Sequence, residues 1–157
     1  MRVASQPRMV LVTAAALLPL ALTSCGLLGP KIDHEAIAAE AAAKSRERVQ
    51  NYLDAMKTKD PNLGREQLCE VLRPSFDTAA TSPNGDFADH FTVTDAIITE
   101  VRANGGEQEI DAAVTVSAAG QDSAINLRFT VRKIGEQWCI ADEVPVEGSA
   151  GTPSTAP

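Results

Sequence analysis

The chain has 157 residues, a length that suits a single domain, and its 21 acidic residues against 14 basic ones give a net charge of −7. The basic residues form no cluster, which argues against a protein that binds nucleic acid or lies on an anionic membrane surface by charge. Only 4% of the residues are aromatic. We therefore expect a core built mainly from Val, Ile, Leu and Ala.

The start of the chain has the pattern of an export signal. Arg2 and Arg8 precede an uncharged, mostly apolar run over residues 9–22, as in the charged and apolar regions of a signal peptide. As a helix this run would be about 21 Å long, too short to cross a bilayer core of about 30 Å. The alternative is a short membrane anchor followed by an incidental cysteine, which this length fits poorly.

The apolar run ends in Leu22-Thr23-Ser24-Cys25, which resembles the lipobox of bacterial lipoproteins. The resemblance covers the first 25 residues. It implies that Cys25 receives diacylglycerol, that residues 1–24 are removed as a lipoprotein signal peptide, and that residues 25–32 form a lipid-anchored tether. The protein would then be attached to the extracytoplasmic face of the cell membrane, where two acyl chains suffice for stable anchoring. Losing Arg2 and Arg8 would change the net charge from −7 to −9.

The two remaining cysteines are Cys69 and Cys139. An even pair in an exported, oxidising setting predicts a disulfide, which would stabilise the fold by about 4 kcal/mol in the chain-entropy model. Two buried thiols and a metal site are the alternatives. The sequence contains no Cys-x-x-Cys and no paired histidines, so we expect no metal site.

The first half of the remaining chain favours helices. Asp33 is a good N-cap for a helix over residues 36–57, whose second half places apolar residues on one stripe, namely Val49, Tyr52, Leu53 and Met56. A second helix is predicted over residues 63–72, ending before Pro74, with Leu68, Cys69 and Leu72 facing inward. Residues 76–80 fit one further helical turn.

Beyond residue 91 the sequence alternates with period two and predicts four strands. They cover residues 92–102, 107–118, a stretch around 125–132, and 137–144; Val93, Ile97 and Val101 are expected to face inward on the first. Turns are predicted at Asn104-Gly105, at residues 120–122 and at Gly135-Glu136. Residues 145–157 are small, polar and Pro-rich, which predicts a disordered tail.

This order of elements predicts an α+β domain over residues 33–144, with two or three N-terminal helices packed on a four-stranded antiparallel meander. The domain resembles the nuclear-transport-factor-2-like (NTF2-like, cystatin-like) superfamily, particularly small envelope lipoproteins of actinobacteria. The resemblance rests on Val49-x-x-Tyr52-Leu53-x-Ala55-Met56, Leu68-Cys69 and Trp138-Cys139-Ile140. It implies a cone-shaped fold, with a curved sheet around the helices and a pocket at the wide end. The superfamily includes enzymes, small-molecule binders and proteins that bind only other proteins.

Enzymes of this kind pair an Asp or His in the pocket with a Tyr, Asp or His. The candidates here are Tyr52, Asp95 and His90, but nothing in their spacing brings two of them within hydrogen-bonding distance. No phosphate-binding loop, serine nucleophile motif or zinc motif is present. We therefore predict a protein that is not an enzyme and has no catalytic residues and no cofactor.

Two functions remain. The first is a non-enzymatic accessory module that binds a protein partner in the cell envelope, and the second is a carrier of a small apolar ligand or lipid in the cone. The candidate pocket-lining residues separate them: a filled cone favours the module and a cavity of several hundred Å³ favours the carrier. These residues are Tyr52, Met56, Phe76, Phe129 and Trp138.

The disulfide also predicts a strand register. If Cys69 lies on a helix packed against the inner face of the sheet, Cys139 must face that helix. This requires Val131 to pair with Cys139 through a three-residue turn that includes Ile134, or through an equivalent bulge. Trp138 and Ile140 would then lie on the outer face, which would make that face a candidate binding surface.

Overall fold

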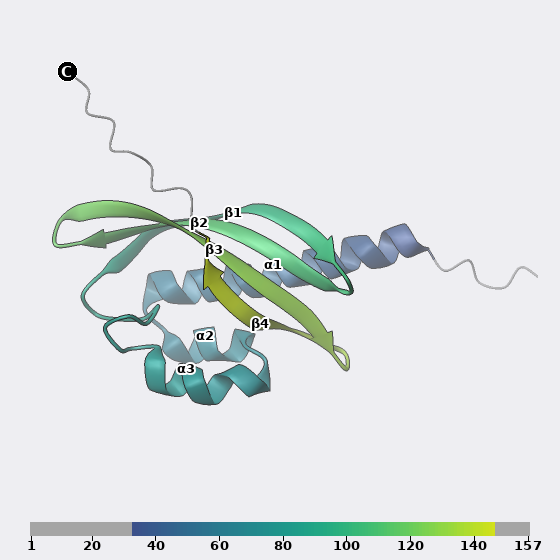
Figure 1. The fold of residues 1–157 in the computed structure, drawn as a ribbon, viewed down its shortest axis with the longest axis horizontal. Helices are drawn as coiled ribbons and strands as arrows, with labels where there is room; N and C mark the ends of the chain where they lie inside the picture. The colour runs from purple at the N-terminus through teal and green to yellow at the C-terminus, as the bar shows by residue number, and fades with distance from the viewer. Residues whose placement is uncertain (1–32, 147–157) are drawn as a thin grey trace, which may run out of the picture. The chain divides into compact units, whose positions relative to one another are not determined.

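A computed structural model describes residues 33–146. Cys25, the predicted signal peptide and tether, and residues 147–157 of the predicted tail lie outside the described residues. The tail prediction was wrong for its first two residues, because Pro145 pairs with Leu127 and the Val146 N–H donates to the Asn126 carbonyl. The described part consists of three α-helices and one short 3-10 helix followed by a four-stranded antiparallel sheet. Figure 1 shows the helices on one side of the curved sheet.

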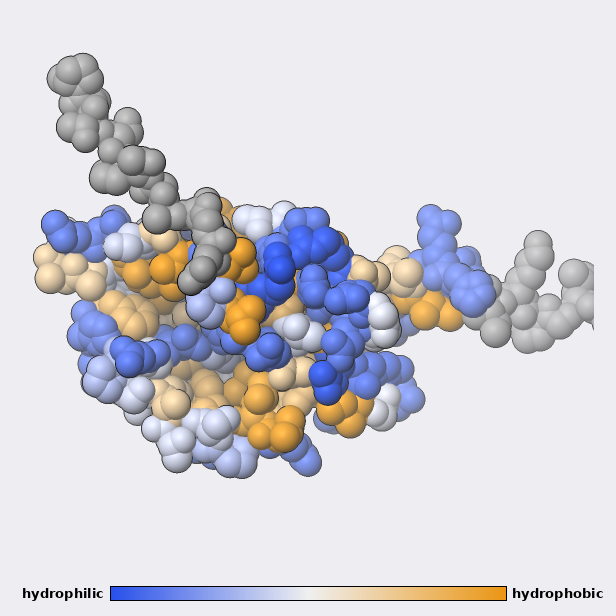
Figure 2. All heavy atoms as spheres, viewed as in Figure 1, coloured by the Kyte–Doolittle hydropathy of each residue, from blue (hydrophilic) through white to orange (hydrophobic). Residues whose placement is uncertain are grey.

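Helix α1 (His34–Thr58) begins at its predicted cap, because the Asp33 side chain accepts hydrogen bonds from the backbone N–H groups of Glu35 and Ala36. Its second half carries the predicted apolar stripe and contacts all four strands. Its first turns lie beyond the sheet, where hydrophobic and hydrophilic side chains are exposed side by side (Figures 1 and 2). Ile37 in this part is 55% exposed.

The predicted second helix is shorter than expected. Helix α2 (Pro61–Gln67) ends before Leu68 and Cys69, which are extended, and the 3-10 helix η1 (Glu70–Leu72) follows. Pro74 does not end a helix but lies in the first turn of α3 (Arg73–Ala79). A proline is tolerated there because the first helical N–H groups have no intrahelical acceptor.

The sheet is a meander of β1 (Thr92–Asn104), β2 (Glu107–Ala118), β3 (Gln121–Ile134) and β4 (Gln137–Pro145). Each connection is a two-residue turn that contains glycine with positive φ: Gly105-Gly106, Ala119-Gly120 and Gly135-Glu136. Such turns match the twist of antiparallel strands. The helices and the meander confirm the α+β fold class predicted from the sequence.

Strand β1 departs from strict alternation. Thr94 and Thr99 are extra residues at two bulges, and their hydroxyls donate to carbonyl oxygens of β2. The bulges turn Ala96 and Ile98 inward and leave Ile97 57% exposed. The prediction that Ile97 faces the core was therefore wrong.

The core lies between α1 and the inner face of the sheet. Strands β2 and β3 contribute the alternating residues predicted for them, and the innermost side chains have no exposed surface; they are Ile110, Val114, Phe129 and Val131. The outer face of the sheet carries ion pairs instead. Asp111 lies between Arg102 and Arg128, at 3.0 and 2.8 Å, and Arg132 pairs with Glu107. The outer face is thus a charged network.

The predicted disulfide is present, but the predicted register is wrong. Cys69 and Cys139 are bonded, with their Cα atoms 4.9 Å apart. Val131 nevertheless pairs with Ile140, and Arg132 pairs with Cys139. Ile140 is fully buried and Trp138 packs against the core, so both face inward.

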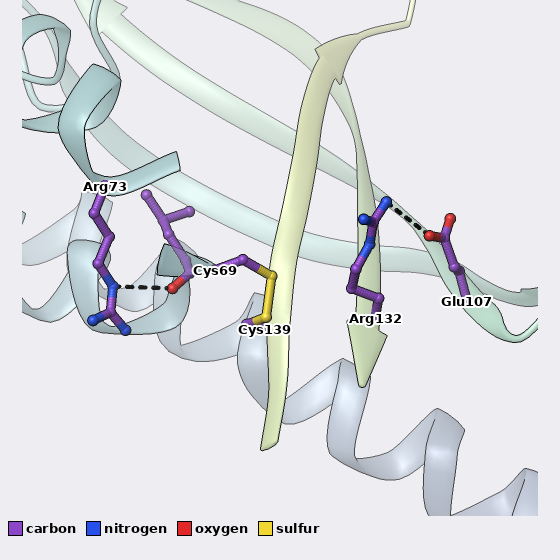
Figure 3. Close-up of a disulfide and its surroundings, with 6 residues drawn as sticks. Cys69, Arg73, Glu107, Arg132 and Cys139 are labelled. Atoms are coloured by element: carbon purple, nitrogen blue, oxygen red, sulfur yellow. Dashed lines mark hydrogen bonds and ion pairs between the residues drawn. A yellow bond between two sulfur atoms is a disulfide. The ribbon is translucent and has the colours of Figure 1, made fainter. Parts of the chain in front are cut away.

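The reason lies in the extended segment Leu68-Cys69. This segment runs beside β4 as a parallel bridge partner of Ile140, and the Cys69 N–H donates to the Ile140 carbonyl at 2.8 Å. Cys69 therefore approaches β4 from the side, not from a helix on the inner face. Figure 3 shows its side chain reaching Cys139 at the edge of the strand.

Candidate functional site

Tyr52 of α1 is the centre of the candidate site. Its ring is 1% exposed and makes edge contacts with the rings of Phe76, Phe87 and Phe129, at centroid distances of 5.8 to 6.4 Å. Its hydroxyl donates to Oδ2 of Asp86 at 2.5 Å. A residue predicted to lie on the apolar stripe thus also has a specific polar partner.

Asp86 is held in place by the loop that follows α3. The Phe87 N–H donates to the Ala80 carbonyl, and the Phe87 ring is buried. A Cβ on Gly85 would lie 2.1 Å from the carbonyl oxygen of Ala79, so only glycine allows the loop to pass this close to α3. The close packing fixes Asp86 opposite Tyr52.

Glu143 of β4 completes the cluster. Thr130 pairs with Asp142 and Val131 pairs with Ile140, so Ala141 is an extra residue in a β-bulge. Beyond the bulge Glu143 pairs with Phe129, a core residue, and therefore faces inward. There it lines one pocket together with Tyr52 and Asp86.

Burial and the neighbouring carboxyl groups shift the pKa values of Glu143 and Tyr52. Burial, followed by the charge of Asp86, raises the pKa of the Glu143 carboxyl well above its ordinary value. Burial and the charges of Glu143 and Asp86 also raise the pKa of the Tyr52 hydroxyl far above its usual range. The Glu143 carboxyl therefore stays protonated to a higher pH than an ordinary glutamic acid.

A pocket of about 320 Å³ opens beside this cluster. Most of its apolar lining comes from α3 and the segment before it. Its polar lining residues are Ser75, Asn84 and three acids, namely Asp86, Asp142 and Glu143. The apolar lining residues are Tyr52, Leu68, Leu72, Phe76, Ala79 and Ala80. This arrangement suits a small molecule with an apolar body and a polar group that donates hydrogen bonds.

The five candidate pocket residues are distributed over different places. Tyr52 and Phe76 line this pocket. Met56 and Phe129 are 1% and 0% exposed and belong to the core, and Trp138 packs against the core from the first half of β4. The centre of the cone is thus filled, and the pocket is confined to one end.

The other catalytic candidates lie elsewhere. Asp95 is exposed on β1 and pairs with Thr115 next to a bulge. His90 is exposed in the loop before β1, where its ring contacts the Phe91 ring. Neither lines the pocket beside Tyr52, so the structure does not bring the three candidates together.

Asp86 and Glu143 were not predicted from the sequence. The available signal for Asp86 is that it directly precedes Phe87, an aromatic residue that is buried in the structure. No signal marked Glu143 as a partner of Tyr52. Because Ile140 faces inward in the structure, Glu143 reaches the inner face only through the bulge at Ala141.

Two further properties of the described residues bear on function. Between residues 33 and 146, no group of three or more His, Cys, Asp or Glu side chains could hold a metal ion. In the same range, no helix is long and apolar enough to cross a membrane.

No protein-family model matches the chain, and no curated protein matches it in sequence. Among solved structures, it is similar to a SEC-C motif containing protein from Rhodopseudomonas palustris, with a TM-score of 0.55 and 14% identity over 71% of this chain and 86% of the other. At this identity the likeness shows the fold alone.

Other similar structures are described as NTF2-like or cystatin-like. An NTF2-like protein of unknown function from Shewanella baltica has a TM-score of 0.46 and 12% identity over 71% of this chain and 94% of that one. A protein of unknown function with a cystatin-like fold from Nostoc punctiforme has a TM-score of 0.44 and 14% identity over 66% of this chain and 87% of that one. Likenesses of this degree carry no argument about function.

Proposed function

We propose that this protein is a lipid-anchored accessory module of the cell envelope, attached through Cys25 to the extracytoplasmic face of the cytoplasmic membrane, where it binds a protein partner and catalyses no reaction. The observation that carries the proposal is the filled cone. Tyr52, Met56 and Phe129 are at most 1% exposed, so the centre of the described domain has no room for a lipid. A domain whose centre is filled acts through its surface.

The lipobox residues Leu22 to Cys25 support the anchor. The Cys69–Cys139 disulfide supports an oxidising compartment outside the cytoplasm. The excess of acidic residues supports attachment by lipid, since an anionic membrane surface would repel the chain.

The pocket beside Tyr52 favours a second function, that of a carrier. Its volume of about 320 Å³ suits a small molecule rather than a diacyl lipid. In this case the ligand would contact Phe76 and the three acids of the pocket lining.

Substitution of the predicted anchor tests the first half of the proposal. Cys25→Ala should leave an uncleaved precursor that carries no diacylglycerol, because the transfer requires the sulfur atom. The measurement is metabolic labelling with a radioactive fatty acid, with Cys69→Ala/Cys139→Ala as the control that retains the label. Maturation of Cys25→Ala at the same site would contradict the anchor.

Native mass spectrometry of the full chain, purified in detergent from its own host, tests the second half. An accessory module should retain a protein partner, whereas a carrier should retain a small molecule that Phe76→Ala releases. Recovery of the bare chain alone would contradict both functions.

A further inference from the structure

Strand β4 is an edge strand, and part of its outer edge is open. The two-residue turn at Gly135-Glu136 makes Ile134 and Gln137 a hydrogen-bonded pair. Hydrogen-bonded and non-hydrogen-bonded pairs alternate along an antiparallel ladder, so Trp138 and Ile140 belong to non-hydrogen-bonded pairs. Their backbone N–H and carbonyl groups therefore point away from β3. The Ile140 carbonyl indeed accepts a hydrogen bond from the Cys69 N–H on this outer side, at 2.8 Å. The Trp138 N–H and carbonyl have no such neighbour on that side among residues 33–146.

A hollow of about 550 Å³ lies along this open edge, next to the disulfide. It is lined by the residues that flank Trp138, namely Gln137 and Cys139, and by residues of η1. Two of its apolar side chains are unusually exposed: Val71 by 78% and Ile134 by 56%. Exposed apolar residues beside unpaired strand groups are the features that receive an added strand.

We propose that the edge of β4 between the β3–β4 turn and the disulfide binds an extended peptide segment of a protein partner, which adds to the sheet as a fifth strand. The fold already uses this mode once, because Leu68-Cys69 is itself an extended segment bridged to Ile140. The partner strand would pair with Trp138 and place alternate apolar side chains against Val71 and Ile134. The net charge of −9 that remains without Arg2 and Arg8 favours a partner segment with basic residues at its ends.

This inference rests on the proposed interaction role and names the surface that performs it. The opposite edge is less suited to the same use, because the bulges at Thr94 and Thr99 interrupt β1. Bulges on an edge strand are a known obstacle to pairing with another chain.

The test isolates one N–H group. A displayed library of random octapeptides is selected on the immobilised full chain, and the enriched peptides are measured on Trp138→Pro and on Trp138→Ala. Both variants lose the indole, but only proline removes the outward N–H, and proline is tolerated where an edge N–H faces away from the sheet. We expect binding to Trp138→Pro to be at least tenfold weaker than to Trp138→Ala. Equal binding to both, or no enriched peptide, would overturn the proposal.

A ligand-side measurement decides the question if Trp138→Pro does not fold. The selected peptides are N-methylated at every second amide, in each of the two registers. Methylation in the register that faces β4 should abolish binding to the unaltered chain, and methylation in the other register should not. Equal loss in both registers, or a complex in which a second copy of the chain covers Trp138, would overturn the proposal.

Different results would contradict the proposed peptide site on β4 and the proposed interaction role. A partner found by native mass spectrometry that cross-links away from β4 would remove the edge site and leave the interaction role. The absence of any partner, with peptides still binding at Trp138, would remove the role and leave an edge that binds peptides.

Discussion

Asp111 and Glu143 are carboxylic acids on the two faces of one sheet, and their pKa values move in opposite directions. Hydrogen bonds from Arg128 and Arg102 lower the pKa of Asp111 on the outer face. Burial and the charge of Asp86 raise the pKa of Glu143 on the inner face. Lying on a strand therefore does not fix the protonation of a carboxyl group. The side chains that pack around it decide whether its ionised or its protonated form is favoured.

Removing the aromatic ring on the inner face should have the largest effect. Tyr52→Ala would leave a cavity among Phe76, Phe87 and Phe129, and should reduce the free energy of unfolding by about 3–5 kcal/mol. Tyr52→Phe is the matched control, since it removes only the hydroxyl and should cost about 1 kcal/mol. Urea unfolding measures both. An equal loss in the two variants would mean that the hydroxyl, not the packing, dominates.

The two carboxyls should give opposite pH dependences of stability. The raised pKa of Glu143 favours the folded state when this group is protonated, so its contribution is complete below its ordinary value of 4.5 and is lost as the pH rises through the raised pKa. Glu143→Gln should remove this loss, so the stability of the variant relative to the unaltered protein should increase as the pH rises. Thermal melting from pH 4 to pH 9 measures the gain, and parallel curves would contradict it.

Asp111 should behave in the opposite sense. Its lowered pKa stabilises the folded state above the ordinary value of 3.8, and this contribution is lost as the pH falls through the lowered pKa. Asp111→Asn should reduce stability near neutral pH by about 1 kcal/mol, a modest value because its arginine partners are partly exposed. The difference from the unaltered protein should vanish in acid. A difference that persists below pH 2 would mean that shape, not charge, is responsible.

The smallest effect should come from the exposed member of two adjacent isoleucines. Ile97→Ala should change the free energy of unfolding by less than about 0.5 kcal/mol, as surface substitutions do. Ile98→Ala, at a site only 8% exposed, should cost about 2–5 kcal/mol. If the two variants are equally destabilised in urea, the bulges that separate them are misplaced.

The elements could be predicted because their signals are local. Alternating residues indicated β2 and β3, glycine-containing pairs indicated the turns, and Asp33 indicated the start of α1. The bulges could not be predicted, because nothing in the residue types of a strand marks which residue is the extra one. A bulge at Thr94 or Ala141 reverses only the faces on which the later residues of that strand lie. Tyr52 was found from helical spacing, whereas its partner Asp86 depends on a loop that folds back over α3.

The disulfide register failed for a different reason. The prediction assumed that Cys69 lay on a helix, and the inward-facing requirement for Cys139 came from that assumption. In the structure Leu68-Cys69 is extended and lies in line with the sheet. Helical propensity up to Leu72 concealed this break, because tertiary pairing with Ile140 overrides a local preference.

The meander has a consequence for the order of events during folding. Every strand pairs with its neighbour in sequence through a two-residue turn, so the sheet can form by successive short loop closures, each with a small entropic cost. Cys69 and Cys139 are 70 residues apart, and β4 must already be paired before its edge exists for Leu68-Cys69 to join. Oxidation of this pair should thus be among the last steps of folding. Chains in which Cys69 and Cys139 are still free thiols should therefore be those whose sheet is incomplete.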